Sequence, residues 1–432
     1  MVAGVHGILS RHLCAHASIS IVVKRFAARK MRPSGQLLAS LATGALVLAG
    51  CGGNATATDA ALHIEVTFHP TQTPAPAEAT AMPAALPAIN LPVTTSTLPA
   101  LPAQAATETP LPATATPSPQ LFSPAAPSAY LSGIRHERQT WNNCGPATIS
   151  MLLSRFGRAE TQREAAKFLK PDKEDKNVSP DELVAYAQSL GYEALAFVGG
   201  DTSVLRTLVT NGIPVIVETW FIPEPNDEMG HYQLLVGYDD ASVIFYDSYE
   251  GPDLREDITK FEPLWRVFNN MAVIVWRPEQ RPFVMEILGE LSDTTRMHAR
   301  ALEKAQAGTA ANAQDKFAWF NAGSSLHALG RSEEAAQAFD AAFKLQLPWR
   351  MMWYQFAPYA AYYDAGRHDD VIALADATLK RVKNVEESYY WRGKSLAAKG
   401  NVEAARADFQ QALVFNPNFV PAQAALNALA TP

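Results

Sequence analysis

The C-terminal third of the chain contains a motif that recurs at a fixed distance. Small and aromatic residues at matched positions lie 70 residues apart, as in Gly323 and Gly393, Ala335 and Ala405, and Phe339 and Phe409. Such a spacing fits two units of about 34 residues with a small insertion, a period typical of stacked helical pairs. The small residues let paired helices pack closely, and the aromatic rings fill the space between them. The pattern therefore predicts an all-α helical-repeat domain over residues 281–432.

The two complete units resemble tetratricopeptide repeats. Their matched residues are Trp319, Gly323, Leu326, Gly330, Ala335, Phe339, Ala342 and Pro348, and Tyr389, Gly393, Leu396, Gly400, Ala405, Phe409, Ala412 and Pro417. A degenerate unit near residues 354–380 keeps Gly366 at its helix–helix turn, and a helix over about 281–307 is expected to cap the array. The resemblance implies a concave surface for a protein partner or the substrate chain. Alternatively, the array only stabilises or spaces the preceding domain.

Aromatic residues are concentrated in the degenerate middle unit, at Trp353, Tyr354, Phe356, Tyr359, Tyr362 and Tyr363. They could line a groove for a partner. Because helical repeats of this type pack aromatic side chains internally, the core between the helices is the favoured location.

The N-terminal region has the pattern of an export signal. Residues 37–50 are a short apolar run that follows a basic segment and ends in small residues. The run of about 15 apolar residues is too short to span a bilayer. Leu48-Ala49-Gly50-Cys51 resembles the bacterial lipoprotein signal, which implies that Cys51 is diacylated and becomes the new N-terminus. Two acyl chains give lasting anchoring. Residues 1–51 are thus expected to be a signal region, with Met31 as an alternative start, and to leave the protein lipid-anchored at the cell membrane, facing outside the cytoplasm.

Residues 52–127 differ in composition from the rest of the chain. They are rich in Pro, Thr and Ala and contain no Lys or Arg. Such a segment cannot bury enough apolar surface to fold, so it predicts a disordered tether. Over the whole chain the net charge is −7, and no basic block indicates binding to nucleic acid. No His/Cys cluster has the spacing of metal ligands, so no metal site is expected.

The stretch Asn143-Cys144-Gly145-Pro146-Ala147 places a thiol at the start of a predicted helix. Proline is favoured in a first helical turn, and the following apolar residues recur at helical spacing up to Gly157. The helix dipole and the free backbone N–H groups of such a position stabilise a thiolate. Since the thiolate is the nucleophilic form of cysteine, the position predicts covalent catalysis. Cys14 and Cys51 belong to the signal region, so no disulfide framework is expected.

His231 is the best candidate for the base among ten histidines. It opens a strand-like run to Tyr238, and residues 243–247, which end at Asp247, form the expected return strand. A hairpin loop of three or five residues puts His231 and Asp247 on the same face, whereas a two-residue loop puts them on opposite faces. An imidazole must meet the carboxylate that orients it, so the odd loop lengths are favoured.

Gln139 lies five residues before Cys144, where its amide could donate a hydrogen bond to an oxyanion beside the nucleophile. Each of these residues also has an ordinary structural interpretation. Cys144 could be a small buried apolar residue, and His231 a core histidine with satisfied hydrogen bonds. Asp247 could cap a turn, and Gln139 could be a loop amide. Their combination in one order favours the catalytic interpretation.

The residues Gln139, Cys144-Gly145-Pro146, Gly230-His231-Tyr232 and Asp247 resemble the papain-like superfamily. More closely, they are similar to bacterial peptidases related to the double-glycine leader peptidases of bacteriocin exporters. The resemblance covers roughly residues 130–278 and implies an α+β papain-like peptidase domain over residues 128–278. In that family Asp-Pro is common where this chain has Asp247-Ser248, which keeps the carboxylate and loosens the turn.

These observations predict a surface-anchored cysteine peptidase that acts on a peptide or protein substrate. Cys144 would be the nucleophile, His231 the base and acid, Asp247 the residue that orients His231, and Gln139 an oxyanion donor. Hydrolysis by a cysteine nucleophile needs no cofactor. Two alternatives remain: a catalytically inactive adaptor that binds partners through its repeats, and another acyl-transfer or amide-hydrolysing enzyme on the same fold.

Overall fold

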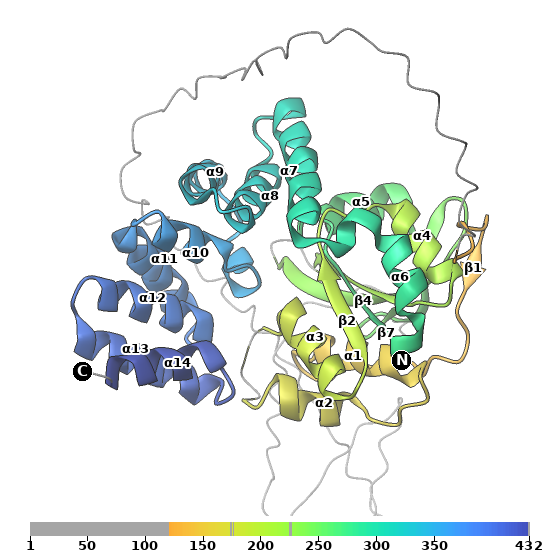
Figure 1. Cartoon of the computed structure of the whole chain (residues 1–432), viewed down its shortest axis with the longest axis horizontal. Helices are drawn as coiled ribbons and strands as arrows, with labels where there is room; N and C mark the ends of the chain where they lie inside the picture. The colour runs from red at the N-terminus through yellow and green to blue at the C-terminus, as the bar shows by residue number, and fades with distance from the viewer. Residues whose placement is uncertain (1–120, 173–174, 176, 224–226, 431–432) are drawn as a thin grey trace, which may run out of the picture. The chain divides into compact units, whose positions relative to one another are not determined.

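The computed structural model describes residues 121–172, 175, 177–223 and 227–430 (Figure 1). Cys14, Cys51, the signal region and the predicted tether up to residue 120 lie outside the described residues. The last residues of the 52–127 range contact the folded part: Ser123 and Asn211 exchange hydrogen bonds of 2.9 and 2.7 Å, and Tyr238 donates to the carbonyl of Ala126 at 2.9 Å. The ordered region thus begins before residue 128. Its described helices include none that is long and apolar enough to cross a membrane.

The α+β part is built on one antiparallel sheet with the strand order β2-β7-β3-β4-β5-β6, and β1 pairs with β4. The strands are β1 (Ala129–Tyr130), β2 (Glu193–Phe197), β3 (Val215–Phe221), β4 (Met229–Tyr238), β5 (Ser242–Asp247), β6 (Gly251–Asp257) and β7 (Ala272–Trp276). Strand β4 is central and almost entirely buried. Its position brings residues from both neighbouring strands, β3 and β5, to one place.

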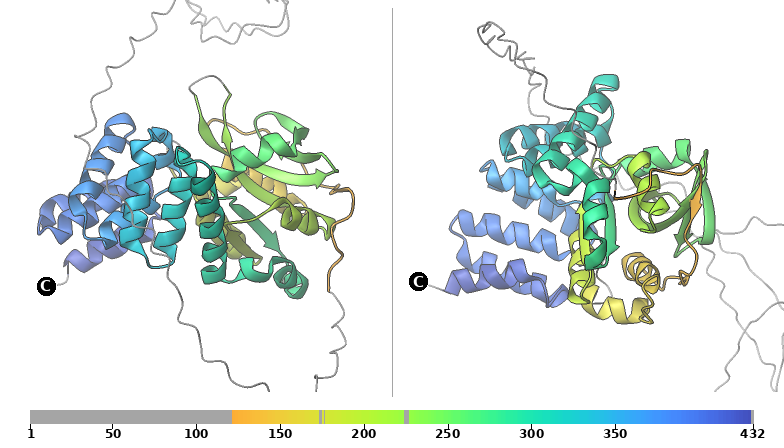
Figure 2. Two further views of the ribbon diagram at one scale, coloured as in Figure 1. Left: turned by 90° about the horizontal axis from the view of Figure 1, so that it is seen from above. Right: turned by 45° about the vertical axis from the view of Figure 1, so that its right-hand side comes forward.

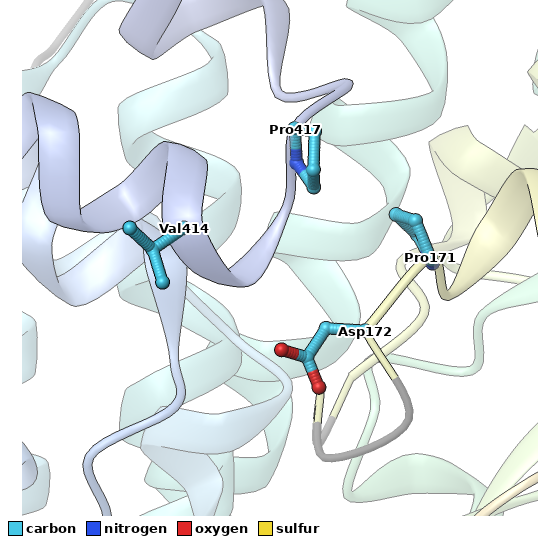
Figure 3. Close-up of a pocket in the computed structure, with 4 residues that line it drawn as sticks. All are labelled: Pro171, Asp172, Val414 and Pro417. Carbon is cyan, nitrogen blue, oxygen red and sulfur yellow. The ribbon is translucent and has the colours of Figure 1, made fainter.

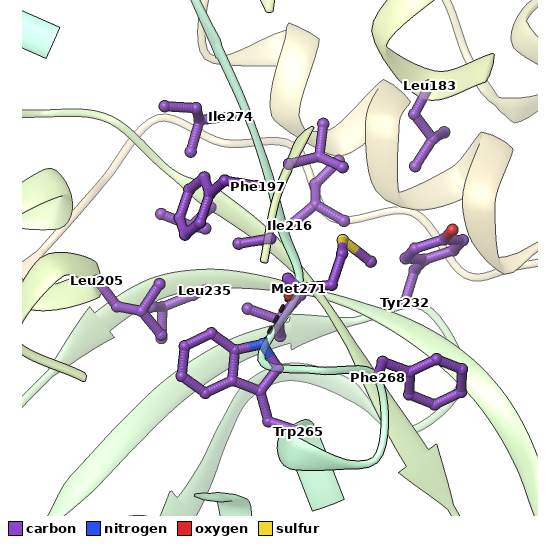
Figure 4. Close-up of a cluster of buried hydrophobic side chains, with 14 of the residues drawn as sticks. Leu183, Phe197, Leu205, Ile216, Tyr232, Leu235, Trp265, Phe268, Met271 and Ile274 are labelled. Carbon is purple, nitrogen blue, oxygen red and sulfur yellow. Dashed lines mark hydrogen bonds between the residues drawn. The ribbon is translucent and has the colours of Figure 1, made fainter. Parts of the chain in front are cut away.

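Five helices accompany the sheet: α1 (Cys144–Ser154), α2 (Gln162–Leu169), α3 (Pro180–Ser189), α4 (Thr202–Thr210) and α5 (Ile258–Arg266). Helix α1 is buried along residues 145–153 and packs against β4, which places its first residue at the sheet. Helix α3 begins with a capping box between Ser179 and Glu182. The core beneath these helices is apolar, and the one polar atom of Trp265 donates to the carbonyl of Met271 at 2.6 Å (Figure 4).

The expected helix over 281–307 is two helices, α6 (Arg281–Leu288) and α7 (Thr294–Ala311), joined by a short 3-10 turn. Gly289 has a positive φ of 52°, which interrupts the helix, and Asp293 caps α7 by accepting from the backbone of Arg296. An apolar pattern alone does not reveal such an interruption, because the residues on both sides of it face the same core.

The repeat region continues as helical pairs (Figures 1 and 2). Its helices are α8 (Lys316–Ala328), α9 (Ser332–Lys344), α10 (Ala357–Asp364), α11 (His368–Arg381), α12 (Glu386–Ala398), α13 (Val402–Phe415) and α14 (Val420–Ala430). The matched glycines lie where paired helices touch: a methyl group at Gly323 would come within 2.8 Å of the Phe339 ring, and one at Gly393 within 2.7 Å of the Phe409 ring. The 70-residue motif therefore marks two equivalent helix–helix contacts.

The aromatic residues of the middle unit divide into two groups. Tyr359 and Tyr362 are buried between helices, as expected. Trp353 is the last residue of a 3-10 helix, η3 (Trp349–Trp353), and Tyr354 follows it; both are half-buried, as are Phe356 and Tyr363. Tyr354 packs against Phe268, which belongs to the α+β part, with ring centroids 6.1 Å apart. This residue is therefore not part of a core between repeat helices.

The α+β part shares one continuous apolar core with the repeat region as far as α11, whereas α13 and α14 pack around a separate cluster that includes Phe409. Polar contacts join them as well: Arg266 pairs with Asp315 at 2.7 Å, and Asn177 donates to Glu387 at 3.1 Å. A hollow of about 440 Å³ lies where Pro171 and Asp172 face Val414 and Pro417 (Figure 3). Because the core is shared, removing the repeats would expose apolar surface of the α+β part.

Candidate active site

Cys144 is the first residue of α1, at the position that the sequence predicts. The preceding Asn143 has a non-helical backbone, so the thiol lies in the first turn of α1, at the positive end of the helix dipole. The thiol is half-buried, and its sulfur accepts a hydrogen bond from the backbone N–H of Tyr232 on β4. Helix α1 and strand β4 thus meet at the sulfur atom.

His231 lies on β4 and is 4% exposed. Its Nε2 atom is 3.0 and 3.1 Å from the two carboxylate oxygens of Asp247, and its ring packs on Phe221 at 4.9 Å between centroids. The imidazole also hydrogen-bonds the thiol of Cys144. Since Nε2 faces Asp247, Nδ1 is the ring nitrogen left for the sulfur. Cys144, His231 and Asp247 therefore form one hydrogen-bonded chain across α1, β4 and β5.

The register of the β4–β5 hairpin explains how His231 meets Asp247. Asp247 pairs with Gln233, so His231 lies diagonally across on the same face, as predicted. Near the turn, however, Tyr238 pairs with Val243. If this pairing continued along the hairpin without a shift, Asp247 would lie opposite Leu234, and its side chain would be on the other face of the sheet from His231. A bulge between Leu235 and Gly237 shifts the pairing by one residue and restores the shared face. Loop length alone is therefore not the cause of the shared face.

The charges of the three side chains support one another. Burial opposes ionisation of the thiol, but the hydrogen bond and charge of His231 lower the pKa of Cys144 below its usual value. Burial likewise opposes the imidazolium, yet Asp247 and Cys144 raise the pKa of His231 to about 10. The pKa of Asp247 falls to about 2, because His231 and two backbone N–H groups outweigh the effect of burial. The geometry thus favours a thiolate–imidazolium pair at neutral pH.

Asp247 is fully buried and held by several donors besides His231. The backbone N–H groups of Tyr249 and Glu250 donate to Oδ1 at 2.7 and 2.8 Å, and the amide of Gln233 donates to Oδ2 at 2.9 Å. Gln233 is itself fixed by the hydroxyl of Thr219 at 3.0 Å. A carboxylate with this many donors stays ionised and keeps one orientation, so it can orient the imidazole.

Gln139 lies beside the end of β5 rather than free in a loop. Its backbone N–H donates to the carbonyl of Ser248 at 2.8 Å, and its Oε1 accepts from the Ser248 hydroxyl at 2.8 Å. With Oε1 held by Ser248, the Nε2 amide group is left as the donor. Ser248, where relatives of the resembled family often have proline, therefore orients the side chain predicted to stabilise an oxyanion.

Gln162, which no sequence motif marks as a site residue, holds the loop before Cys144. Its Oε1 accepts from the backbone N–H of Thr140 at 2.7 Å and from the side chain of Asn143 at 2.8 Å. Its Nε2 donates to the carbonyl of Arg138 at 2.7 Å. A capping box with Thr161 marks the start of α2, but nothing in the local sequence shows that the next side chain reaches back across the loop.

The comparisons with known proteins divide the chain at the same places. Residues 131–273 match the model of the Peptidase_C39 like family. Residues 295–345 and 386–419 match two tetratricopeptide repeat models. Among curated proteins, none matches the chain significantly.

Solved structures similar to the chain include a C39-like peptidase from Bacillus anthracis, which is 18% identical and has a TM-score of 0.31. The match covers 35% of this chain and 98% of that one. The peptidase domain of Streptococcus ComA is 15% identical, covering 34% of this chain and 98% of that domain, with a TM-score of 0.29. YrrB, described as a tetratricopeptide protein with an unusual peptide-binding site, is 16% identical over 33% of this chain and 90% of its own, with a TM-score of 0.18.

Proposed function

We propose that the protein is a cysteine peptidase. The observation that carries this proposal is the hydrogen-bonded chain of Cys144, His231 and Asp247, in which the thiol pKa is lowered and the imidazole pKa is raised. The match of residues 131–273 to the C39-like peptidase model supports the same reaction class. An inactive adaptor would need neither the activated thiol nor the buried carboxylate behind the imidazole.

The site suggests a reaction in two halves. The Cys144 thiolate adds to the carbonyl carbon of a peptide bond, and the resulting oxyanion accepts hydrogen bonds from the Gln139 amide and a backbone N–H of the first turn of α1. Collapse of this intermediate breaks the C–N bond, while the imidazolium of His231 gives its proton to the departing amine. Water then attacks the thioester, His231 accepts a proton from it, and a carboxylic acid and the free thiol are released.

A thiol-directed peptide probe tests the proposal in the full chain. A peptide vinyl sulfone should label the wild-type protein, and Cys144→Ala should lose both labelling and peptide hydrolysis without a change in its circular dichroism spectrum. Cys51→Ser is the matched control, because it also removes one cysteine and should keep both. Labelling that persists in Cys144→Ala, or hydrolysis that survives, would show that Cys144 is not the nucleophile.

We propose further that Cys51 anchors the peptidase to the outer side of a cell membrane through lipid. The support is the Leu48-Ala49-Gly50-Cys51 motif after a short apolar run. In bacterial cells grown with radioactive palmitate, the wild type should carry label and sediment with membranes, whereas Cys51→Ser should carry none. Cys14→Ser is the control and should behave as wild type. Equal labelling of both variants would refute the anchor.

The helical pairs support a third proposal, that the repeat region binds the substrate chain or a protein partner. Stacked pairs present an extended surface that follows directly after the α+β part in the sequence. Because the two parts share one core, deleting the repeats would damage the α+β part too, so point substitutions on exposed helix positions are the proper test. Such substitutions should raise KM for a protein substrate and leave a short peptide unaffected; equal effects on both substrates would argue against substrate binding by the repeats.

A further inference from the structure

The segment between α9 and α10 reaches from the repeat region onto the strand that carries His231. In this segment, Arg350 donates to the carboxylate of Asp227 at 2.6 Å and to the carbonyl of Glu228 at 3.1 Å. Both acceptors immediately precede β4, which begins at Met229. The guanidinium of Arg350 is in turn stacked near Trp349 and Trp353, at 5.5 and 5.4 Å from their ring centres. The repeat region therefore fixes the chain just before the catalytic strand.

Tyr354, the residue after η3, contacts the catalytic strand itself. Its hydroxyl oxygen accepts a hydrogen bond from the backbone N–H of Gly230, the residue before His231. Its ring lies so close to Gly230 that a methyl group there would be 3.1 Å from the ring carbon Cδ1. On the other side of His231, the hydroxyl of Tyr232 donates to the carbonyl of Val178 at 2.9 Å. His231 is thus held between one anchor in the α+β part and one in the repeat region.

The side chain of Tyr354 is also close enough to Cys144 for the charge of the thiolate to affect it. Burial raises the pKa of Tyr354 above its usual value, and the nearby charges of Cys144 and Glu218 raise it further. Glu218 is only 2% exposed, its Oε2 has no hydrogen-bond partner, and a methyl group at Gly230 would lie 2.8 Å from its Oε1. Tyr354, Glu218 and Gly230 therefore pack together next to the thiol, and the tyrosine is the member supplied by the repeats.

We propose that Tyr354 and Arg350 of the repeat region are positioning residues of the active site, which hold the start of β4 so that His231 meets Cys144. This proposal deepens the proposed peptidase function and makes the repeats part of the catalytic machinery. Anything that displaces η3 would also displace the residue before His231. A ligand on the repeats could therefore change the reactivity of the thiol without touching it.

The test uses full-length variants and the rate at which iodoacetamide alkylates Cys144, measured against pH. Tyr354→Phe removes the acceptor of the Gly230 N–H and keeps the ring. The matched control is Tyr362→Phe, because Tyr362 is also buried in the repeats and donates to Asp340 at 2.8 Å, away from β4. Loss of one buried hydrogen bond at the site should slow alkylation near neutral pH about fivefold and lower kcat similarly. Tyr362→Phe should lower the melting temperature and leave alkylation and kcat unchanged.

A second pair of variants covers the case in which Tyr354→Phe folds poorly. Arg350→Met should also slow alkylation, whereas Arg392→Met, which removes ion pairs with Asp376 and Asp408, should not. Alkylation rates that are equal within each pair would overturn the proposal, whether or not the protein cleaves peptides. Slower alkylation in Tyr354→Phe and Arg350→Met alone would support it even if no peptide were cleaved, so its failure is distinguishable from failure of the peptidase assignment.

Discussion

The repeat region and the α+β part build their key contacts from residues at very different separations in the sequence. In the repeats, Gly393 meets Phe409 and Gly323 meets Phe339, and both contacts span 16 residues. In the α+β part, Cys144 meets His231 across 87 residues. A local contact recurs wherever its motif recurs, so the sequence period reveals it. A contact between residues far apart in the sequence depends on strand register, on bulges and on the hydrogen bonds that hold loops, and a change in any one of these can break it.

The largest expected effect tests the distant contacts. Asp247→Asn removes the charge that holds the His231 imidazolium, and an amide in its place favours the wrong tautomer of the ring. We expect kcat/KM to fall about 100-fold or more, as happens when a triad carboxylate is replaced. The pH at which the rate of Cys144 alkylation begins to rise should shift upward, because an uncharged imidazole no longer stabilises the thiolate. If alkylation of the variant rose at the same pH as in the wild type, Asp247 would not be what maintains the thiolate–imidazolium pair.

That dependence on register explains which parts of the site the sequence could predict. The helix start at Cys144 and the shared face of His231 and Asp247 follow from helical spacing and strand alternation. The bulge at Leu235–Gly237, which actually creates the shared face, leaves no alternation signal, because β4 is buried along nearly its whole length. Gln162 and Tyr354 also escaped prediction, since each reaches the site from an element defined by its own, unrelated pattern.

The repeat region shows the converse. Both complete helical pairs and the turn at Gly366 were predicted from spacing alone, and the structure confirms them. Two corrections arise there: the break at Gly289, where a single backbone angle interrupts an otherwise apolar helix pattern, and Tyr354, which packs against Phe268 of the α+β part instead of between repeat helices. The contact of Tyr354 with Gly230 belongs to neither region alone, so no pattern within either region could reveal it.

A matched pair of glycine substitutions makes the contrast quantitative. Gly230→Ala and Gly393→Ala would each place a methyl group within 2.8 Å of a buried neighbour, Glu218 Oε1 and the Phe409 ring respectively. Overpacking of this kind costs about 1–3 kcal/mol, so both variants should lose stability in urea denaturation. Only Gly230→Ala should also slow Cys144 alkylation, by roughly tenfold if the shift costs about 1.4 kcal/mol at the site. Slower alkylation in Gly393→Ala would mean that the two regions are coupled more widely than through η3.

A smaller effect is expected at Ser248. Ser248→Ala removes the hydroxyl that holds Gln139 Oε1, so the amide can turn and present its oxygen to the oxyanion. The loss of one orienting hydrogen bond, worth about 0.5–1.5 kcal/mol, should lower kcat a few-fold and leave KM and iodoacetamide alkylation unchanged. Ser292→Ala is the control, since its hydroxyl donates only to the carbonyl of Gly289 in the 3-10 turn. A change in alkylation would indicate that Ser248 acts on Cys144 or Asp247 instead of on Gln139.

The smallest catalytic effect is expected when buried carboxyl groups are neutralised in both regions. Burial raises the pKa of Glu218 well above its usual value, and burial together with Glu386 does the same for Glu387 in α12. Burial thus favours the protonated form of both acids in the folded protein more than in the unfolded chain. Their stabilising contribution is therefore complete below the unfolded pKa of about 4.3 and declines as pH rises towards the folded pKa.

Glu218→Gln and Glu387→Gln should accordingly match the wild type in melting temperature near pH 4 and exceed it progressively at higher pH. Below the folded pKa of each acid, neither variant should alter alkylation by neutral iodoacetamide, because the replaced acid is uncharged there. The two sites should differ only above the folded pKa of Glu218, where its ionised carboxylate lies near the thiolate and repels the anionic reagent iodoacetate. Glu218→Gln should then react faster with iodoacetate than the wild type, and Glu387→Gln should not. A stability gain that is already complete at pH 4 would mean that both acids are ionised in the folded protein. Protonation of Glu218 and Glu387 could then not explain any difference between the two sites.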